Sequence, residues 1–416
     1  MIEGRGDSPQ FALDNLDPAR IRKAREREGL TRKELADRIE KTPSAVSQFE
    51  SGVTRPDVNT LIRIGMALQL PTLYFAKPAH QAQAQSEIAF DTCHFRARRR
   101  VSQKARRASV RLGEDVLEIT DYIERQGINF PEESITSFMP VRDEIMSRCA
   151  DTTEAIEQVA SALRAHWGLG LGPIPNLVHL LESQGVFVLP LAEVHADVDA
   201  YSTWVGGRPC MMLALNKSAA HARFDAGHEL GHLILHDDTY QVGEHETEDQ
   251  AHRFSGAFNV PREAFYQECP RYWSLDAFVS LKSRWKLSVG ALVRRGKDVG
   301  RLSESSYRRA YRELSQRGFR KREPLDDATP HERPVLLDQA FELLRGEVSL
   351  QTLARELRTS MSRAAETLRH VVSSKTLSDL RRASTPAPPL RLVSLDRSSE
   401  AATQSATERG QNPTQS

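Results

Sequence analysis

The sequence predicts a multidomain, mainly α-helical protein whose central part is α+β and contains a small sheet. The chain has 416 residues, which is enough for two to four domains. Amphipathic patterns with capping residues indicate helices on both sides of the centre. Within the centre, two short apolar runs at residues 186–189 and 211–215 are bounded by glycine and proline, as β-strands commonly are.

Composition indicates a globular protein without a membrane partner. Hydrophobic residues make up 39% of the chain and charged residues 27%, which is sufficient for packed cores. No apolar run approaches the ~20 residues of a membrane span. The first residues lack the basic start and apolar core of a secretory signal. Four widely spaced cysteines form no CxxC pair, and together these features predict a reducing, cytoplasmic location.

Charge is unevenly distributed, although the formal net charge is only +1. One segment is basic and contains no acidic residue: Arg96, Arg98, Arg99, Arg100, Lys104, Arg106, Arg107 and Arg111. Such a cluster can attract phosphate groups. It can equally be a solvated helix face that pairs with acidic residues elsewhere, and charge patterning alone does not separate these interpretations.

Residues 18–70 have the pattern of four or five short, well-capped helices. Thr31 and Glu34 have the spacing of a capping box. Thr42 places an N-cap hydroxyl before Pro43, a proline at the first helical position. Gly52 is suited to a left-handed C-cap. Two helices joined by a turn of about four residues, the second short and polar on one face, fit the major groove of DNA.

This segment resembles the XRE (Cro-repressor-like) helix-turn-helix family in Leu35, Ala36, Ile39, Val46, Ser47, Glu50, Gly52, Pro56 and the helix over 61–68. It departs from the family at Glu40, where glycine is usual in the turn, and at Lys41, where an apolar residue is usual. The resemblance implies binding to double-stranded operator DNA. It also allows for a homodimer, because such proteins usually bind paired half-sites.

The resemblance further implies two sets of DNA contacts. Four residues of the second helix would face base edges: Ser44, Ala45, Ser47 and Gln48. Four basic residues would hold phosphates, which position a protein without reading sequence: Arg32, Lys33, Lys41 and Arg55. The alternative interpretation is a helical module that binds protein rather than DNA.

The segment His228-Glu229-Leu230-Gly231-His232 carries the pattern HExxH. Residues four apart lie on the same face of a helix, so both imidazoles can bind one Zn²⁺ ion. Glu229 would face the open coordination position and accept a proton from a bound water, whose pKa zinc lowers to about 7. A purely structural zinc site has no use for such a carboxylate, which favours a catalytic site.

A third protein ligand is needed for such a site. His236 is eight residues beyond His228, about 12 Å of helix rise, which is too far to share the ion. An acidic residue from a following helix is the better candidate: Glu244, Glu246, Glu248 or Asp249. Tyr201 and His252 are candidates for stabilising an oxyanion. Three histidines without partners at ligand spacing are interpreted as ordinary: His179, His195 and His221.

The HExxH segment and its surroundings resemble the ImmA/IrrE family of metallopeptidases, in which an ExxAN-x-F-A-x-x-L-L-x-P pattern follows the HExGH helix. The corresponding stretch here runs from Glu248 to Pro261. Matching residue by residue makes Glu248 the third ligand. His252 stands where the family commonly has asparagine, and Phe258 and Asn259 stand where it has two apolar residues. The resemblance covers most of residues 151–330.

Together these patterns predict five segments. Residues 15–78 form a helix-turn-helix bundle, and residues 79–150 a basic linker that is helical over 92–148, with a break near Gly127 and Pro131. Residues 151–270 form a zincin-like metallopeptidase domain, and residues 271–380 a C-terminal helical domain of generic packing. Residues 381–416, rich in Ser, Thr, Pro and Gln, form a disordered tail.

Three functions are compatible with these predictions. ImmA/IrrE relatives are known for cleaving XRE-type repressors, and here both types share one chain. The preferred hypothesis is therefore a DNA-binding transcriptional regulator whose zinc endopeptidase domain cleaves a repressor, in trans or in its own chain. The second hypothesis is a DNA-binding regulator whose peptidase-like domain is a non-catalytic ligand or metal sensor. The third is a peptidase whose amino-terminal helices dock a protein substrate.

Overall fold

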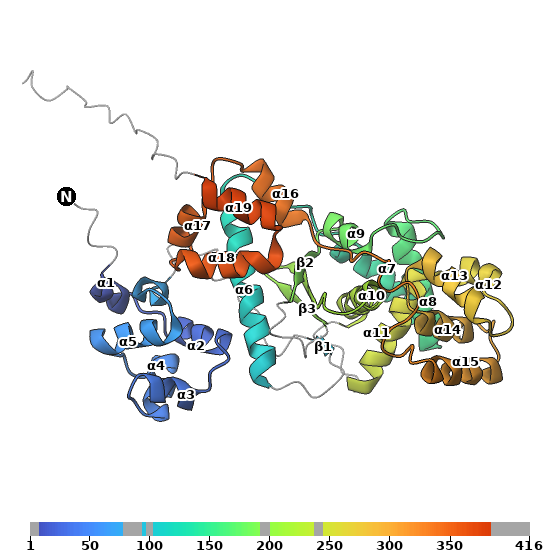
Figure 1. Ribbon diagram of the computed structural model, residues 1–416, viewed down its shortest axis with the longest axis horizontal. Helices are drawn as coiled ribbons and strands as arrows, with labels where there is room; N and C mark the ends of the chain where they lie inside the picture. The colour runs from blue at the N-terminus through green and yellow to red at the C-terminus, as the bar shows by residue number, and fades with distance from the viewer. Residues whose placement is uncertain (1–7, 78–93, 97–102, 192–199, 237–243, 384–416) are drawn as a thin grey trace, which may run out of the picture.

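The computed structural model describes residues 8–77, 94–96, 103–191, 200–236 and 244–383. Helices surround one small sheet (Figure 1), which confirms the prediction of a multidomain, mainly α fold with an α+β centre. No helix among these residues is long and apolar enough to cross a membrane. The disorder predicted from residue 381 onward is wrong for Arg381 and Arg382, which belong to a helix over Ser374–Arg382, and from residue 384 the predicted tail lies outside the described residues.

The sheet contains four strands in the order β1-β3-β4-β2. They are β1 (His94–Arg96), β2 (Phe187–Pro190), β3 (Ala200–Val205) and β4 (Arg208–Leu213). β3 pairs antiparallel with β1 and β4, and β2 pairs parallel with β4. β2 and β4 confirm the two strands predicted from apolar runs. The helical prediction over 92–148 is wrong for β1, because pairing with the distant β3 overrides the local pattern.

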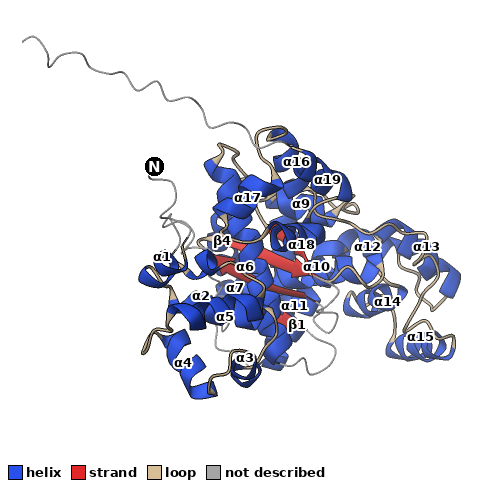
Figure 2. Ribbon diagram, turned by 60° about the vertical axis from the view of Figure 1, so that its left-hand side comes forward, coloured by secondary structure: helices blue, strands red, loops and turns tan. Residues whose placement is uncertain are grey.

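Helices cover both faces of the sheet (Figure 2), and successive side chains of β2 and β4 enter opposite cores. Val188 and Met211 share one core with five helices: α7 (Ile135–Arg148), α8 (Thr152–His166), α9 (Leu177–Ser183), α10 (Ala219–Leu235) and α11 (Glu244–Asn259). Phe187 and Met212 share the opposite core with five others: α6 (Gln103–Arg125), α16 (Leu336–Leu343), α17 (Leu350–Glu356), α18 (Met361–Val371) and α19 (Ser374–Arg382). The predicted break is confirmed, since α6 ends at Arg125 and α7 begins at Ile135.

Two further groups of helices have their own cores. The amino-terminal group contains α1 (Pro9–Asp14), α2 (Pro18–Arg27), α3 (Arg32–Arg38), α4 (Pro43–Ser51), α5 (Val58–Leu68) and η1 (Thr72–Phe75). The second group contains α12 (Arg262–Glu268), α13 (Leu275–Trp285), α14 (Val289–Asp298) and α15 (Glu304–Gln316). Its core includes Phe224 of α10, so this group packs directly against the centre. The five segment boundaries given above stay predictions.

The caps predicted for the amino-terminal group are confirmed. Thr31 and Glu34 form a reciprocal capping box. The Thr42 hydroxyl accepts a hydrogen bond from the Ala45 N–H at 3.1 Å, and Gly52 has a left-handed φ of 74°. These contacts fix where α3 and α4 begin and where α4 ends.

The turn between α3 and α4 recurs in the carboxyl-terminal half. Glu40 has a left-handed φ of 55°, and the equivalent φ is 56° at Lys286 and 51° at Arg358. In each case the helix N-cap follows two residues later, at Thr42, Ser288 and Ser360. The pairs α13–α14 and α17–α18, interpreted from sequence as generic packing, therefore share the backbone turn of the helix-turn-helix.

Candidate metal centre and DNA-binding surface

Two glycines bring α10 and α11 into close contact, side by side in Figure 1. A Cβ atom added at Gly231 would lie 3.0 Å from the Cα of Ala251, and one at Gly227 would lie 2.6 Å from the Ser255 hydroxyl. Side chains at these positions would separate the helices. Every residue of α10 except His221 is buried, so the HExxH segment lies inside the protein and faces α11.

His228, His232 and Glu248 converge at one point. The two histidine Nε2 atoms are 3.0 Å apart, and the Glu248 carboxylate oxygens lie 3.3 Å from Nε2 of His228 and 3.2 Å from Nε2 of His232. Ligand atoms about 2.0–2.1 Å from a tetrahedral Zn²⁺ ion are about 3.3 Å from one another. The three side chains therefore fit a divalent ion of this size, and they form a candidate metal centre.

Electrostatics at this centre favour a charged carboxylate. Burial alone would raise the pKa of Glu248, but hydrogen bonds to His228 and His232, and the charge of these rings, outweigh burial and lower the pKa well below its usual range. The carboxylate is thus held in its ionised form, which is the form that binds a cation.

His236 supports the centre without belonging to the three convergent groups. Its Nδ1 lies 2.9 Å from Nδ1 of His232, and its Nε2 lies 3.0 Å from Oε1 of Gln250. Its distance along the helix from His228 predicts that His236 is not a ligand, and His236 is absent from the convergent group. Neither its contact with His232 nor its contact with Gln250 was predicted from the sequence. The i, i+4 spacing of His232 and His236 was the available signal.

Glu229 lies on the sheet side of α10. It is fully buried, and its Oε2 accepts a hydrogen bond from the Ser202 hydroxyl of β3 at 2.8 Å. It is not one of the three convergent groups. The contact with Ser202 could not be predicted from the sequence, because only the pairing of β3 into the sheet brings Ser202 to α10.

Among the other candidates around the motif, those whose side chains the structure describes lie apart from this centre. Among the alternative third ligands, Asp249 pairs with Arg253 at 2.7 Å and Glu246 accepts from Gln250 at 3.4 Å. The side chain of Glu244 and the whole of His195 are outside the described residues. The oxyanion prediction is wrong for Tyr201, whose hydroxyl donates to the Ser109 carbonyl on the opposite face of the sheet.

His252 stays close to the candidate ligands, and the other two histidines do not join them. The ring centroid of His252 lies 6.1 Å from that of His228 and 4.6 Å from that of Phe224. His179 is exposed at the start of α9, and His221 contacts the Ser218 hydroxyl at 2.9 Å. His252 thus lies near the candidate ligands, and its stabilisation of an oxyanion stays a prediction.

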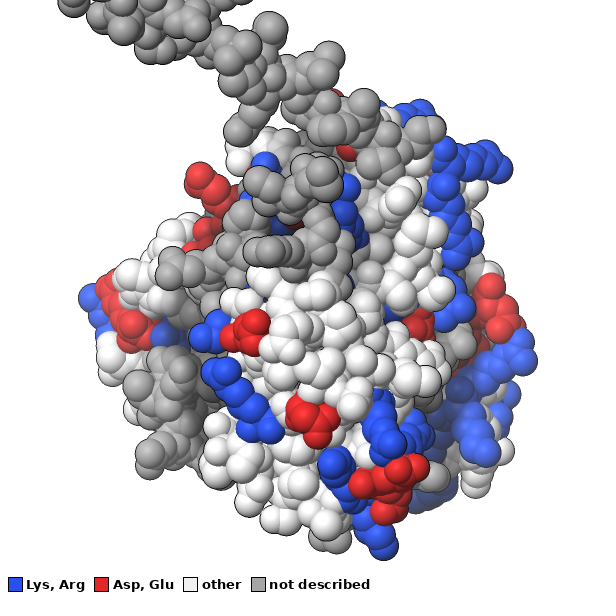
Figure 3. Space-filling model, turned by 90° about the vertical axis from the view of Figure 1, so that its left-hand side faces the viewer, with Lys and Arg blue, Asp and Glu red and all other residues white. Residues whose placement is uncertain are grey.

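The residues expected to read DNA lie along the outer side of α4. Ser44 and Gln48 are exposed, and Ala45 and Ser47 are half-buried. Lys33, Lys41 and Arg55 are exposed around them. Figure 3 shows this end of the molecule, where Lys and Arg gather toward the right-hand edge with Asp and Glu among them.

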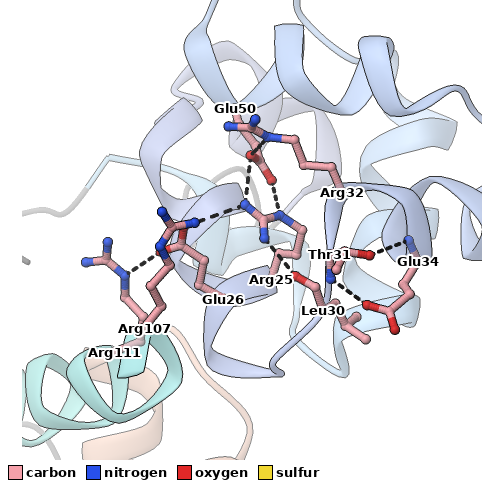
Figure 4. A network of polar contacts seen from close by, with 9 residues as sticks. All are labelled: Arg25, Glu26, Leu30, Thr31, Arg32, Glu34, Glu50, Arg107 and Arg111. Carbon is pink, nitrogen blue, oxygen red and sulfur yellow. Dashed lines mark hydrogen bonds and ion pairs between the residues drawn. The ribbon is translucent and has the colours of Figure 1, made fainter. Parts of the chain in front are cut away.

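Arg32 differs from the other predicted phosphate contacts because it is tied to the bundle. Its Nε donates to Glu50 at 2.9 Å (Figure 4). Glu50 also accepts two hydrogen bonds from Arg25, at 2.5 and 3.0 Å, and both of these side chains are buried. Arg25 donates to the Leu30 carbonyl at 2.7 Å as well. This network joins α2, α3 and α4 and holds α4 in place.

Part of the basic segment pairs with acidic residues, as its second interpretation predicted. Arg111 donates to Glu26 of α2 at 3.0 Å, and Arg107 lies 3.9 Å from Glu26 (Figure 4). Arg111 also donates to Glu114 at 2.6 Å. These contacts join α6 to the amino-terminal group. The side chains of Arg96, Arg98, Arg99, Arg100 and Lys104 lie outside the described residues.

Two family models match parts of the chain. Residues 21–75 match a helix-turn-helix family, and residues 181–297 match the IrrE N-terminal-like domain family of M78 peptidases. The chain thus contains an XRE-type DNA-binding domain and an ImmA/IrrE-type metallopeptidase-like domain, which confirms both resemblances. The search of curated proteins found no match to the chain.

Proposed function

We propose that this protein is a cytoplasmic, DNA-bound transcriptional regulator with an active zinc-dependent endopeptidase domain. In this proposal the peptidase cleaves a repressor of the XRE type, in trans or within its own chain, and so relieves repression. The observation that carries the proposal is the convergence of His228, His232 and Glu248, whose ligand atoms lie within 4.8 Å of one another. Glu229 directly follows His228 in the sequence.

The residues at the centre have separate roles in this proposal. His228, His232 and Glu248 would hold the ion, and Glu229 would accept and return the proton during peptide hydrolysis. Zinc, when bound, supplies Lewis acidity that polarises a carbonyl and acidifies water. Ser202 would hold the Glu229 carboxylate in position through its hydrogen bond of 2.8 Å.

The DNA-binding half of the proposal assigns roles on and around α4. Ser44, Ala45, Ser47 and Gln48 would contact base edges. Arg32, Lys33, Lys41 and Arg55 would contact phosphates, with Arg32 also bound to Glu50 at 2.9 Å. Binding to paired half-sites would require a homodimer.

The test of the peptidase uses purified protein loaded with zinc and XRE-type repressors encoded near its gene. Wild-type protein should cleave one of them. The Glu229→Gln variant should retain one equivalent of metal but not cleave, and the His232→Ala variant should lose both metal and cleavage. Full cleavage by Glu229→Gln would overturn the assignment of Glu229, and no cleavage of any repressor or of the chain itself would overturn the peptidase.

A second candidate function has one observation in its favour. Glu229 has no exposed surface and is hydrogen-bonded to Ser202, as expected if its carboxylate holds α10 to the sheet. The domain would then sense a metal or ligand without catalysis. In that case zinc would change operator affinity equally in wild-type and Glu229→Gln proteins, whereas a peptidase mechanism requires the two proteins to differ in relieving repression in cells.

A further inference from the structure

A pocket of about 370 Å³ opens beside the candidate metal centre. One wall contains Phe224 of α10 and His252 of α11. Phe224 precedes His228 by four residues and His252 follows Glu248 by four, so each lies one helical turn from a candidate ligand. The ring centroids of His252 and His228 are 6.1 Å apart. The pocket therefore lies next to the helical turns that carry the candidate ligands.

The opposite wall comes from α14, α15 and the segment that follows α15. It includes Arg294, Tyr311, Phe319 and Arg320. Glu323 anchors this segment, because its carboxylate accepts hydrogen bonds from the N–H groups of Val289 and Gly290 at 2.7 and 3.1 Å. The wall that bears Arg320 is thus fixed to the first turn of α14.

Most charges that line the pocket are already compensated. Glu323 pairs with Lys282 at 2.8 Å, and Arg294 pairs with Asp298 at 3.0 Å. Arg320 is exposed, and it forms no ion pair with any residue that the structure describes. The pocket therefore has apolar walls, formed by Phe224, Leu314 and Phe319, and one cationic group available to a ligand.

We propose that this pocket binds an acidic residue, Asp or Glu, of the protein substrate close to the scissile bond. The inference rests on the proposed peptidase function and adds its substrate class. The methylene groups of the acidic residue would contact Phe224 and Phe319, and its carboxylate would accept hydrogen bonds from the planar guanidinium of Arg320. A volume of about 370 Å³ accommodates a side chain together with adjoining backbone.

The test measures peptide binding, which needs no turnover. Full-length, zinc-loaded Glu229→Gln protein is immobilised, exposed to a randomised peptide library, and the retained peptides are sequenced by mass spectrometry. Asp and Glu should be enriched at one position. The same protein with Arg320→Glu should instead retain Lys or Arg there. Arg312→Glu, an equal charge change at an exposed residue of α15 outside the pocket lining, should keep the acidic preference.

A second measurement uses the best retained peptide and its copy with Gln in place of Glu. By fluorescence anisotropy, the neutral copy should bind about tenfold more weakly, and this difference should disappear in Arg320→Glu. An acidic preference that survives Arg320→Glu, or no acidic preference at all, overturns the pocket assignment. Acidic peptides that bind to a wild-type protein unable to cleave any substrate would leave the pocket standing and remove the peptidase. Cleavage of a substrate without any preference for acidic peptides would support the peptidase and overturn the pocket assignment.

Discussion

Nδ1 of His236 lies 2.9 Å from Nδ1 of His232. The ligand nitrogen Nε2 of His232 faces Glu248, so the opposite nitrogen of the same ring is held by a second histidine. Gln250 holds that second histidine in turn, at 3.0 Å. Contacts of this kind fix the tautomer and the orientation of a metal-binding imidazole.

Replacing His236 should therefore weaken metal binding. We expect His236→Phe to lower zinc affinity about 10- to 100-fold, because the His232 ring loses its partner. Competition with a chromophoric chelator measures the affinity. His179→Phe changes an exposed histidine on α9 and should leave zinc affinity unchanged. Equal affinities for wild type and His236→Phe would show that the contact between His232 and His236 does not orient the ligand.

Glycine at position 40 should stabilise the helix-turn-helix. Glu40 has a left-handed φ of 55°, which costs a residue with a Cβ atom about 1 kcal/mol relative to glycine. Its exposed ion pair with Arg63, at 2.6 Å, contributes less than this. We expect Glu40→Gly to raise the urea midpoint of unfolding and to leave operator affinity unchanged. Asp37→Gly, inside α3, should lower the midpoint because glycine weakens a helix interior.

Removing Arg25 should unfold the amino-terminal group more readily. Arg25→Met leaves the buried Glu50 carboxylate with Arg32 alone, and breaking a buried ion pair costs about 3–5 kcal/mol. Urea unfolding should show this loss, and operator binding should weaken because α4 is no longer held. Arg55→Met alters an exposed residue; it should weaken DNA binding with a stability change within about 0.5 kcal/mol. Equal stability of the two variants would contradict the role of the Glu50 network.

The contact between the helix-turn-helix and α6 should depend on pH. Burial raises the pKa of Glu118 to about 7 from 4.5, partly opposed by Arg20, which lies 3.5 Å away. Between pH 4.5 and 7 the folded protein keeps a proton that the unfolded chain releases, so stability falls as pH rises through this interval and levels off above it. Thermal unfolding of the full chain from pH 5 to 8 measures this change.

Two variants separate this effect from other titrations. Glu118→Gln removes the titrating group, so its unfolding temperature should depend less on pH than that of wild type. Glu132→Gln, at an exposed position, should follow wild type. A Glu118→Gln profile parallel to wild type would assign the pH dependence to other groups.

Much of the local structure could be predicted because it rests on neighbours in the chain. The capping box at Thr31 and the N-cap at Thr42 depend on contacts three residues apart. The pairing of His228 with His232 depends on one turn of α10. Strand β1 could not be predicted, because three residues form a strand only when β3 lies beside them.

Residue spacing along the chain was not enough to identify Glu248 as the third group at the metal centre. Four acidic residues followed the HExxH helix, and spacing alone did not choose among them. Gly227 and Gly231 let α11 approach α10 closely enough for Glu248 to reach both imidazoles. This close contact depends on how α10 and α11 pack against each other, which spacing along the chain does not specify.

Sequence patterns alone therefore predicted where α3 begins, where α4 begins and ends, and the pair of histidines one turn apart, since short-range hydrogen bonds and helix periodicity set them. The packing of separate elements determines which carboxylate contacts the two histidines. It also brings His236 and Ser202 into contact with residues of the motif and places Tyr201 on the other side of the sheet. These relationships join residues from separate elements, and only the burial of both sheet faces brings those elements together.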